Sequence, residues 1–398
     1  MLKINIIHKL LRGMLFLPSV TFNIFKSEIF PWAVIWLLCT RIRFKLADIL
    51  ILSMLMFWLL AGLFSYQSGS ALTTAASYLN PILAFILVLN CSEELIGKVF
   101  ATLKFIFPIF CITAVFQTLG LLTLFDVIFD FAVPRGGVGD VGGSRGVSIF
   151  STEPSRAVVE LIFMYGALIS LACSYKGIKL GSVTSDLFMG LLVLGIIKSA
   201  TGLLFFFILM AIRRPVLLWP ILVCIFALLS YLVIETRALG LFFEIIESGS
   251  FIDAVSVLVT QSGFRILSVV SSYIYGLHNF VGAGIGGWEY LAVDSYYLAG
   301  FQPSDVSFFR THYEGQFVAL KPTAYGAIIA LELGFISVIL FTFYLQKRLR
   351  LFSLGYEKHE FAVIMIFLLY VFFLGAIGNP VPWVCAALAV RAAERRLC

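Results

Sequence analysis

The residues best suited to chemistry lie in one short segment, 145–160, which contains Arg145, Glu153, Arg156 and Glu160. Glu153, Arg156 and Glu160 are spaced i, i+3 and i+7, so a helix would place all three on one face. The planar guanidinium group of arginine can bind phosphate oxygens through two hydrogen bonds. A carboxylate can accept a proton from a hydroxyl group. The segment indicates a site for an anionic ligand. The simpler interpretation is a capped helix with a surface Arg–Glu pair.

Pro154 predicts where this helix begins, because proline suits the first helical position. The N-terminus of a helix offers unpaired N–H groups and a partial positive charge, and both favour anions. Glu160 then lies inside an apolar run, where a carboxylate usually faces a polar cavity.

Further candidate ligand-binding residues are scattered along the chain: Lys198, Arg265, His278, Arg310, His312 and Lys321. Arg265 belongs to a stretch, 262–280, whose apolar stripe predicts an amphipathic helix lying on a membrane, with Ser268 and Ser272 on its polar face. An interfacial or core position is the simpler interpretation of His278. His312 stays open as a general base, and Lys198 could equally snorkel to the interface.

The amino-acid composition indicates whether water or lipid surrounds these residues. Of 398 residues, 61% are hydrophobic and 13% are charged, and the mean hydropathy is +1.03. Soluble domains are roughly 45–50% apolar and about 25% charged, so lipid must surround most of this chain. We expect an all-α, polytopic integral membrane protein forming one membrane domain over 1–398. The cysteines show neither a disulfide framework nor a C-x-x-C spacing, and we expect no metal and no cofactor.

A helix needs about 20 apolar residues to cross a membrane. The clearest spans are 46–66, 71–89, 105–125, 157–173, 216–234, 324–345 and 361–378. Shorter candidates are 10–25, 29–40, a hairpin over 183–213 that turns at Ser199–Gly202, and a return over 381–393. The short loops rich in Lys and Arg all fall on one side if the hairpin crosses twice. This arrangement predicts about 12 spans with both termini cytoplasmic.

Two longer segments then face outward: 126–155, and 235–323 between spans nine and ten. The second holds roughly 90 residues, far more than a usual connection, and we expect it to be partly helical. The two segments and their flanks carry Arg135, Arg145, Arg156, Arg237, Arg265, Arg310 and Lys321. Together these cations favour a lipid-attached anion such as a polyprenyl diphosphate, although a solvated or headgroup surface is as good an interpretation of any single arginine. Arginines would stabilise such a diphosphate as a leaving group in sugar transfer.

The order of three short motifs resembles the bacterial O-antigen and exopolysaccharide polymerase family, which is related to the O-antigen ligases. The motifs are Arg145 followed by Phe150-Ser-Thr-Glu153-Pro154-Ser155; Lys198-Ser199-Ala-Thr-Gly202; and Ser262-Gly-Phe-Arg265, a helix, then Gly282-Ala-Gly-Ile-Gly286. The resemblance implies polymerisation of undecaprenyl-diphosphate-linked oligosaccharide repeat units on the outer side of the cytoplasmic (inner) membrane. It also implies that Arg145, Glu153 and Arg265 hold or activate the donor.

Alternatives remain open at this point. Ligases typically carry a His-Asn pair where this chain has Lys321-Pro322-Thr323-Ala324-Tyr325, which favours a polymerase over a ligase. A transporter would show repeated halves with broken helices, and no such repeat is evident. A non-enzymatic scaffold would not require outward arginines. Besides the lipid-linked sugar and membrane lipids, a chain-length regulator is a conceivable partner. We expect no nucleic acid.

Overall fold

The computed structural model describes residues 2–19, 32–40, 42–66, 70–121, 147–151, 153–176, 183–193, 199–217, 220, 249–250, 253, 257, 259–260 and 264–397. Within these ranges the chain is helical and contains no strand. Five helices are long and apolar enough to cross a membrane. They are α3 (Leu46–Tyr66), α4 (Ser70–Asn90), α5 (Glu93–Thr118), α7 (Pro154–Lys176) and α16 (Tyr325–Leu349). The described chain is therefore all-helical, as predicted, and five of its helices have the length and apolar composition of membrane spans.

The predicted spans agree closely with α3, α4, α7 and α16, and α7 begins at Pro154 as expected. The helix α5 differs, because it begins well before the predicted span 105–125. Ser92 caps this helix by accepting a hydrogen bond from the N–H of Leu95 at 3.4 Å, and two glutamates follow in the first turn. Both features stabilise a helix N-terminus. Lys98 and Lys104 are consequently helical, although the basic pattern placed them in a loop.

The two expected N-terminal spans, 10–25 and 29–40, are not found as predicted. The helix α1 (Leu2–Met14) ends at Met14, before the middle of the first, and α2 (Trp32–Leu38) has only 7 residues. At a rise of 1.5 Å per residue, α2 spans only about 10 Å. Residues 20–31 lie outside the described ranges, as does almost all of the predicted span 216–234. The described chain supports five long spans and does not confirm the count of twelve.

The predicted hairpin over 183–213 falls on two short helices, α8 (Val183–Leu191) and α9 (Ala200–Arg213), and neither is long enough to count as a membrane span. The predicted turn at Ser199–Gly202 is wrong, because these residues begin α9. Ser199 caps α9 by accepting a hydrogen bond from the N–H of Gly202 at 3.4 Å. Asp186, near the start of α8, pairs with Arg213 at 2.5 Å and Arg214 at 2.8 Å, at the end of α9. The chain therefore returns to the level at which the hairpin began.

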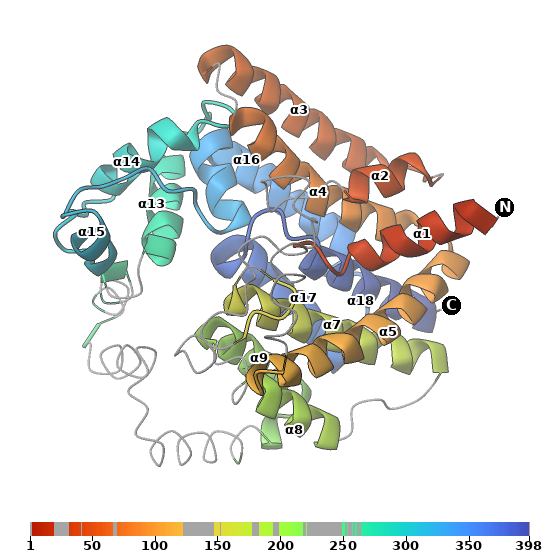
Figure 1. Ribbon diagram of the computed structural model, residues 1–398. Coiled ribbons are helices and arrows are strands. Elements are labelled where there is room, and N and C mark those ends of the chain that lie inside the picture. The colour runs from red at the N-terminus through yellow and green to blue at the C-terminus, as the bar shows by residue number, and fades with distance from the viewer. Residues whose placement is uncertain are drawn as a thin grey trace.

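The core lies around the C-terminal helix α18 (Val381–Leu397), which packs on α7 and α4. Residues 381–390 of α18 are all buried, and three of them, Ala386, Ala387 and Ala389, are alanines. Small side chains allow membrane helices to approach closely. Before it, α17 (Lys358–Leu369) continues into the π-helix η3 (Tyr370–Leu374). Figure 1 shows α7 and α18 within the bundle, whereas α13, α14 and α15 lie to one side, beside α16.

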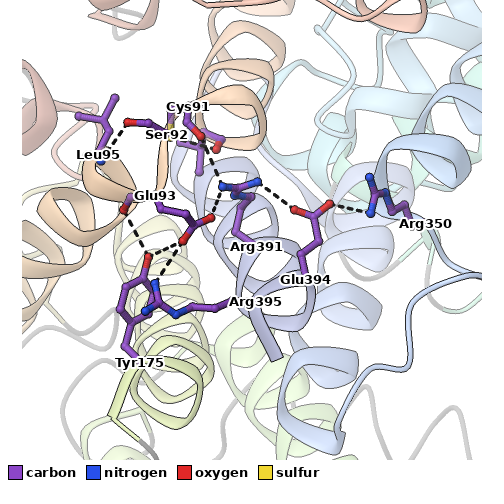
Figure 2. A network of polar contacts seen from close by, with 10 residues as sticks. Cys91, Ser92, Glu93, Leu95, Tyr175, Arg350, Arg391, Glu394 and Arg395 are labelled. Atoms are coloured by element: carbon purple, nitrogen blue, oxygen red, sulfur yellow. Dashed lines mark hydrogen bonds and ion pairs between the residues drawn. The ribbon is translucent and has the colours of Figure 1, made fainter. Parts of the chain in front are cut away.

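At one end of the bundle, arginines and carboxylates join the helix termini. Figure 2 shows Glu93, at the start of α5, meeting Arg391 and Arg395 of α18, while the Tyr175 hydroxyl donates to Glu93 at 3.1 Å. Deeper in this end, Arg348 of α16 pairs with Asp48 of α3 at 2.9 Å, and both side chains are buried. Glu394 pairs with both Arg350 and Arg391 (Figure 2), so the basic segments around 348 and 391 gather at one end, as the positive-inside pattern requires.

Beside α16 lie α13 (Phe264–His278), α14 (Trp288–Leu298) and α15 (Ser307–His312). The expectation that α13 turns a serine face to water was wrong: Ser268, Ser271 and Ser272 are fully buried. Their hydroxyls donate hydrogen bonds to carbonyls of their own helix. The serines therefore form a surface of small side chains on α13. A Cβ on Gly276 would meet the carbonyl oxygen of Ala330 at 2.9 Å. Small residues therefore pack α13 directly along α16.

The glycine-rich turn after α13 enters the bundle and interrupts α16. Gly334 has φ 79° and ψ 169°, so the helix is broken there. The turn compensates for the lost helical bonds, because the N–H of Gly284 donates to Glu332 O at 3.0 Å and that of Ile336 to Phe280 O at 3.3 Å. A Cβ on Gly282 would lie 2.1 Å from the carbonyl oxygen of Glu332. The lack of a side chain at Gly282 therefore allows the turn to approach the backbone of α16 closely.

Gly334→Ala should lower the free energy of unfolding by about 3 kcal/mol, because this backbone conformation is essentially restricted to glycine. Its new Cβ would also lie 2.4 Å from Phe280 O. Gly97→Ala is the matched control: this glycine is helical, and a Cβ added to it would have no atom within 4 Å, so alanine should stabilise α5 by about 1 kcal/mol. Thermal unfolding in detergent measures both, and equal melting temperatures would contradict the structural role of the break.

Candidate functional site

Two of the three candidate catalytic residues meet at the start of α7. Arg265, 112 positions further along the chain, forms an ion pair with Glu153. Its Nη1 donates to Ser155 Oγ at 3.4 Å, and Ser155 Oγ donates to Glu153 Oε2 at 3.2 Å. The first turn of α13 supplies Arg265, whereas Glu153 and Ser155 flank Pro154 at the start of α7. The third residue, Arg145, lies outside the described ranges.

The charge state of Glu153 follows from this arrangement. Partial burial raises the pKa of Glu153, but the charge and hydrogen bond of Arg265, with the charge of Arg156, outweigh it and hold the pKa below 4.5. A depressed folded pKa stabilises the fold above the unfolded value, and this contribution is lost as the pH falls through the folded pKa. Glu153 is therefore ionised at neutral pH. The side chains are about half exposed, 48% and 47%, so the pair contributes at most about 1 kcal/mol.

Arg156 and Glu160 continue the same face of α7 toward the bundle interior. Glu160 is fully buried and accepts hydrogen bonds from Ser151 Oγ at 2.7 Å and Asn379 Nδ2 at 2.9 Å. Arg156, Glu160, Asn379 and Ser19 help line a cavity of about 10 Å³, close to the space that one water molecule needs. The expected polar cavity at Glu160 is thus present, although it is small.

Asn379 was not among the candidate residues. Its Oδ1 accepts the N–H of Val381 at 3.0 Å, so Asn379 caps α18 while its amide holds Glu160. An asparagine and a proline directly before an apolar run, here Asn379 and Pro380, are a recognisable signal for the start of a helix. The sequence could therefore have suggested the cap, but its contact with Glu160, 219 positions away, depends on the packing of α18 against α7.

A second buried carboxylate, Glu332 of α16, receives three hydrogen bonds. The donors are the Tyr78 hydroxyl at 2.8 Å, the N–H of Gly286 at 2.9 Å and the N–H of Trp288 at 3.2 Å. Donors within the bundle thus satisfy the buried Glu332 carboxylate. This carboxylate fastens α4 and the glycine-rich turn to α16.

Lys321, a candidate substrate-binding residue, lies near this second carboxylate. Its Nζ donates to Thr74 Oγ1 at 3.3 Å and to Ser77 Oγ at 3.5 Å, both on α4. Burial lowers the pKa of Lys321, and the charges of Glu332 and Glu289 partly offset that effect. The side chain thus ties the segment before α16 to α4, and no hydrogen bond or ion pair in the described part of the chain joins it to Glu153 or Arg265.

The remaining candidate residues lie at different distances from Arg265. Arg310 and His312 lie on α15, and the ring of Phe308 is 4.9 Å from that of Phe264, the neighbour of Arg265, and 5.1 Å from that of His312. These contacts place His312 near the start of α13. His278 lies at the other end of α13, about 20 Å along the helix axis from Arg265 at 1.5 Å per residue, so the two do not share a site. Lys198 lies outside the described ranges.

Comparison with family models, with curated proteins and with solved structures finds no match. The functional interpretation therefore depends on the residues and their geometry.

Glu332→Ala should destabilise the fold by about 3–5 kcal/mol, because three buried donors lose their acceptor. Glu332→Gln keeps one acceptor oxygen at nearly the same volume and should cost less than half as much. The melting temperatures of the purified variants in detergent provide the measurement. Similar losses for both variants would show that side-chain volume, and not hydrogen bonding, holds this joint.

Proposed function

We propose that the protein is a membrane glycosyltransferase that polymerises polyprenyl-diphosphate-linked oligosaccharide repeat units on the outer side of the bacterial cytoplasmic membrane. The meeting of Arg265 with Glu153 and Ser155 at the N-terminus of the spanning helix α7 carries this proposal. A lipid-linked diphosphate requires cations beside a membrane helix, where its tail can lie between helices. Arginine and a helix N-terminus both suit its phosphate oxygens.

The reaction assigns a role to each charged group. A hydroxyl oxygen of the acceptor sugar attacks the anomeric carbon of the growing chain with inversion, and the bond from that carbon to the diphosphate oxygen breaks. The diphosphate leaves with the electron pair, and Arg265 and Arg156 stabilise its charge. Glu153, ionised and half exposed, can accept the hydroxyl proton. The resemblance of the chain to the polymerase family implies that Arg145 is a third cation that binds the diphosphate.

The expected sidedness is part of the same proposal. About 12 spans with both termini cytoplasmic would place the Glu153–Arg265 pair outside. Two observations support that orientation: the Arg348 and Arg391 networks lie at one end of the bundle, and Arg265 lies where α7 begins, at the end opposite Tyr175.

One observation favours a transporter as a second candidate. The helix α16 is interrupted at Gly334, and transporters often bind substrates at interrupted helices. In this protein, however, the glycine-rich turn fills the interruption through backbone hydrogen bonds. A ligase would use the same lipid-linked donor with another acceptor.

Arg265→Ala should reduce chain elongation by about 100-fold or more, because a preorganised cation is lost from the leaving group. Single repeat units should accumulate on the lipid carrier while the protein remains in the membrane. Glu153→Gln tests the carboxylate, and Lys358→Gln, on α17, is the control that should leave glycan length unchanged. Gel analysis of glycan length in a strain lacking the wild-type protein measures all three, and normal chains from Arg265→Ala would refute the assigned role.

The deletion strain also separates the candidate functions. Loss of long chains alone identifies a polymerase. Loss of all attached glycan, with lipid-linked polymer retained, identifies a ligase. Failure to export the repeat unit identifies a transporter.

The orientation can be measured independently with single cysteines in a cysteine-free background. Arg310→Cys, on α15, should react with a membrane-impermeant maleimide in intact cells. Lys358→Cys should react only after permeabilisation, because it begins α17 at the arginine-rich end. The opposite labelling pattern would place Arg265 in the cytoplasm and remove the basis of the proposed activity.

A further inference from the structure

The exposed face of α16 changes character along its length. Ile336, Leu340 and Phe343 are exposed apolar side chains, and Lys347 follows them on α16. The steps of three or four residues keep these four on one helical stripe, and Arg350 comes directly after the last residue of the helix. An apolar surface thus ends in two cations at the arginine-rich end of the bundle.

A pocket lies where this stripe ends. Its volume is about 410 Å³, and Phe343, Gln346, Lys347, Arg350 and Phe352 contribute to its lining. The pocket is shallow and open, and its lining residues all lie within 343–353. Phe352 is 87% exposed, so the wall that it forms offers a large apolar surface to whatever enters from the lipid side.

The backbone at Arg350 is unusual. Arg350 ends α16 in the left-handed conformation with φ 52°, and its N–H donates to Gln346 O. Glycine or asparagine ordinarily occupies such a position, and strained backbone tends to persist at functional sites. The left-handed turn redirects the chain, so that residues 351–353 form the second wall of the pocket.

The charges in the pocket are only partly compensated. Arg350 pairs with Glu394 at 2.9 Å, and 44% of its side chain remains exposed. Lys347 is exposed and has no ion-pair partner within the described part of the chain. An anion in the pocket would therefore meet one unpaired cation and one accessible guanidinium.

We propose that this pocket binds the phosphate headgroup of an anionic phospholipid, with an acyl chain lying along Ile336, Leu340 and Phe343. The order of groups matches such a lipid: the apolar stripe lies toward the middle of the membrane and the cations lie at its surface. Basic pockets at the ends of membrane helices are suited to anionic headgroups. A soluble phosphate carries the same negative charge but has no apolar group that could pack on the stripe. This inference is independent of the proposed glycosyl transfer.

The test measures lipid retention by the full-length protein purified in detergent, using phosphatidylglycerol and phosphatidylcholine as probes and native mass spectrometry as the readout. We expect one phosphatidylglycerol to be retained and phosphatidylcholine to be lost. Lys347→Gln should weaken retention about fivefold, since a cation near a membrane surface contributes about 1 kcal/mol. Arg350→Asn should weaken it similarly and keep the fold, because asparagine tolerates the left-handed conformation.

Lys98→Gln is the charge-matched control, since Lys98 lies on α5 and pairs with Glu94; retention should be unchanged. Phe343→Ala should weaken lipid retention without affecting binding of inorganic phosphate. Equal retention of the two lipids would overturn the proposal, as would equal losses from Lys98→Gln and Lys347→Gln. Complete competition by inorganic phosphate would assign the pocket to a soluble anion instead.

Discussion

A carboxylate buried among apolar helices must obtain its hydrogen-bond donors from the protein, and Glu332 does so by joining three separate parts of the chain. Tyr78 of α4 and the backbone of Gly286 and Trp288 converge on it. This joint holds the glycine-rich turn against the break in α16, and the turn fixes where α13 ends. Since α13 packs along α16, its first turn can bring Arg265 to Glu153. The candidate site therefore depends on a carboxylate that takes no part in it.

The sequence predicted those elements whose signals are local. Apolar length located α3, α4, α7 and α16, and Pro154 marked the start of α7. The spacing of Glu153, Arg156 and Glu160 correctly indicated a face leading from the helix N-terminus to a buried carboxylate. These features need only helical periodicity and the length of a membrane span.

Tertiary contacts produced what the sequence did not predict. The serines of α13 looked like a polar face because hydroxyls usually prefer water, but they bond to their own helix and become a small-residue packing surface. The break at Gly334 had no local sign, since its cause is the turn at 280–286. The pairing of Arg265 with Glu153 likewise depends on α13 lying beside α16, which no spacing between positions 112 apart could reveal.

The arginines differ in burial, and therefore in how much free energy it costs to separate each one from its carboxylate partner. Arg348 and Asp48 have exposed side-chain fractions of 6% and 0%, so breaking that pair would leave an uncompensated buried charge, at a cost of about 3–5 kcal/mol. Arg265 and Glu153 are about half exposed, so exchanging Glu153 for another anion costs about 1 kcal/mol or less. In the proposed reaction, a diphosphate, with more negative charge and several acceptor oxygens, would compete with Glu153 for Arg265. The displaced carboxylate would then be available to accept a proton, so that donor binding and activation of the acceptor would be coupled in one exchange of partners.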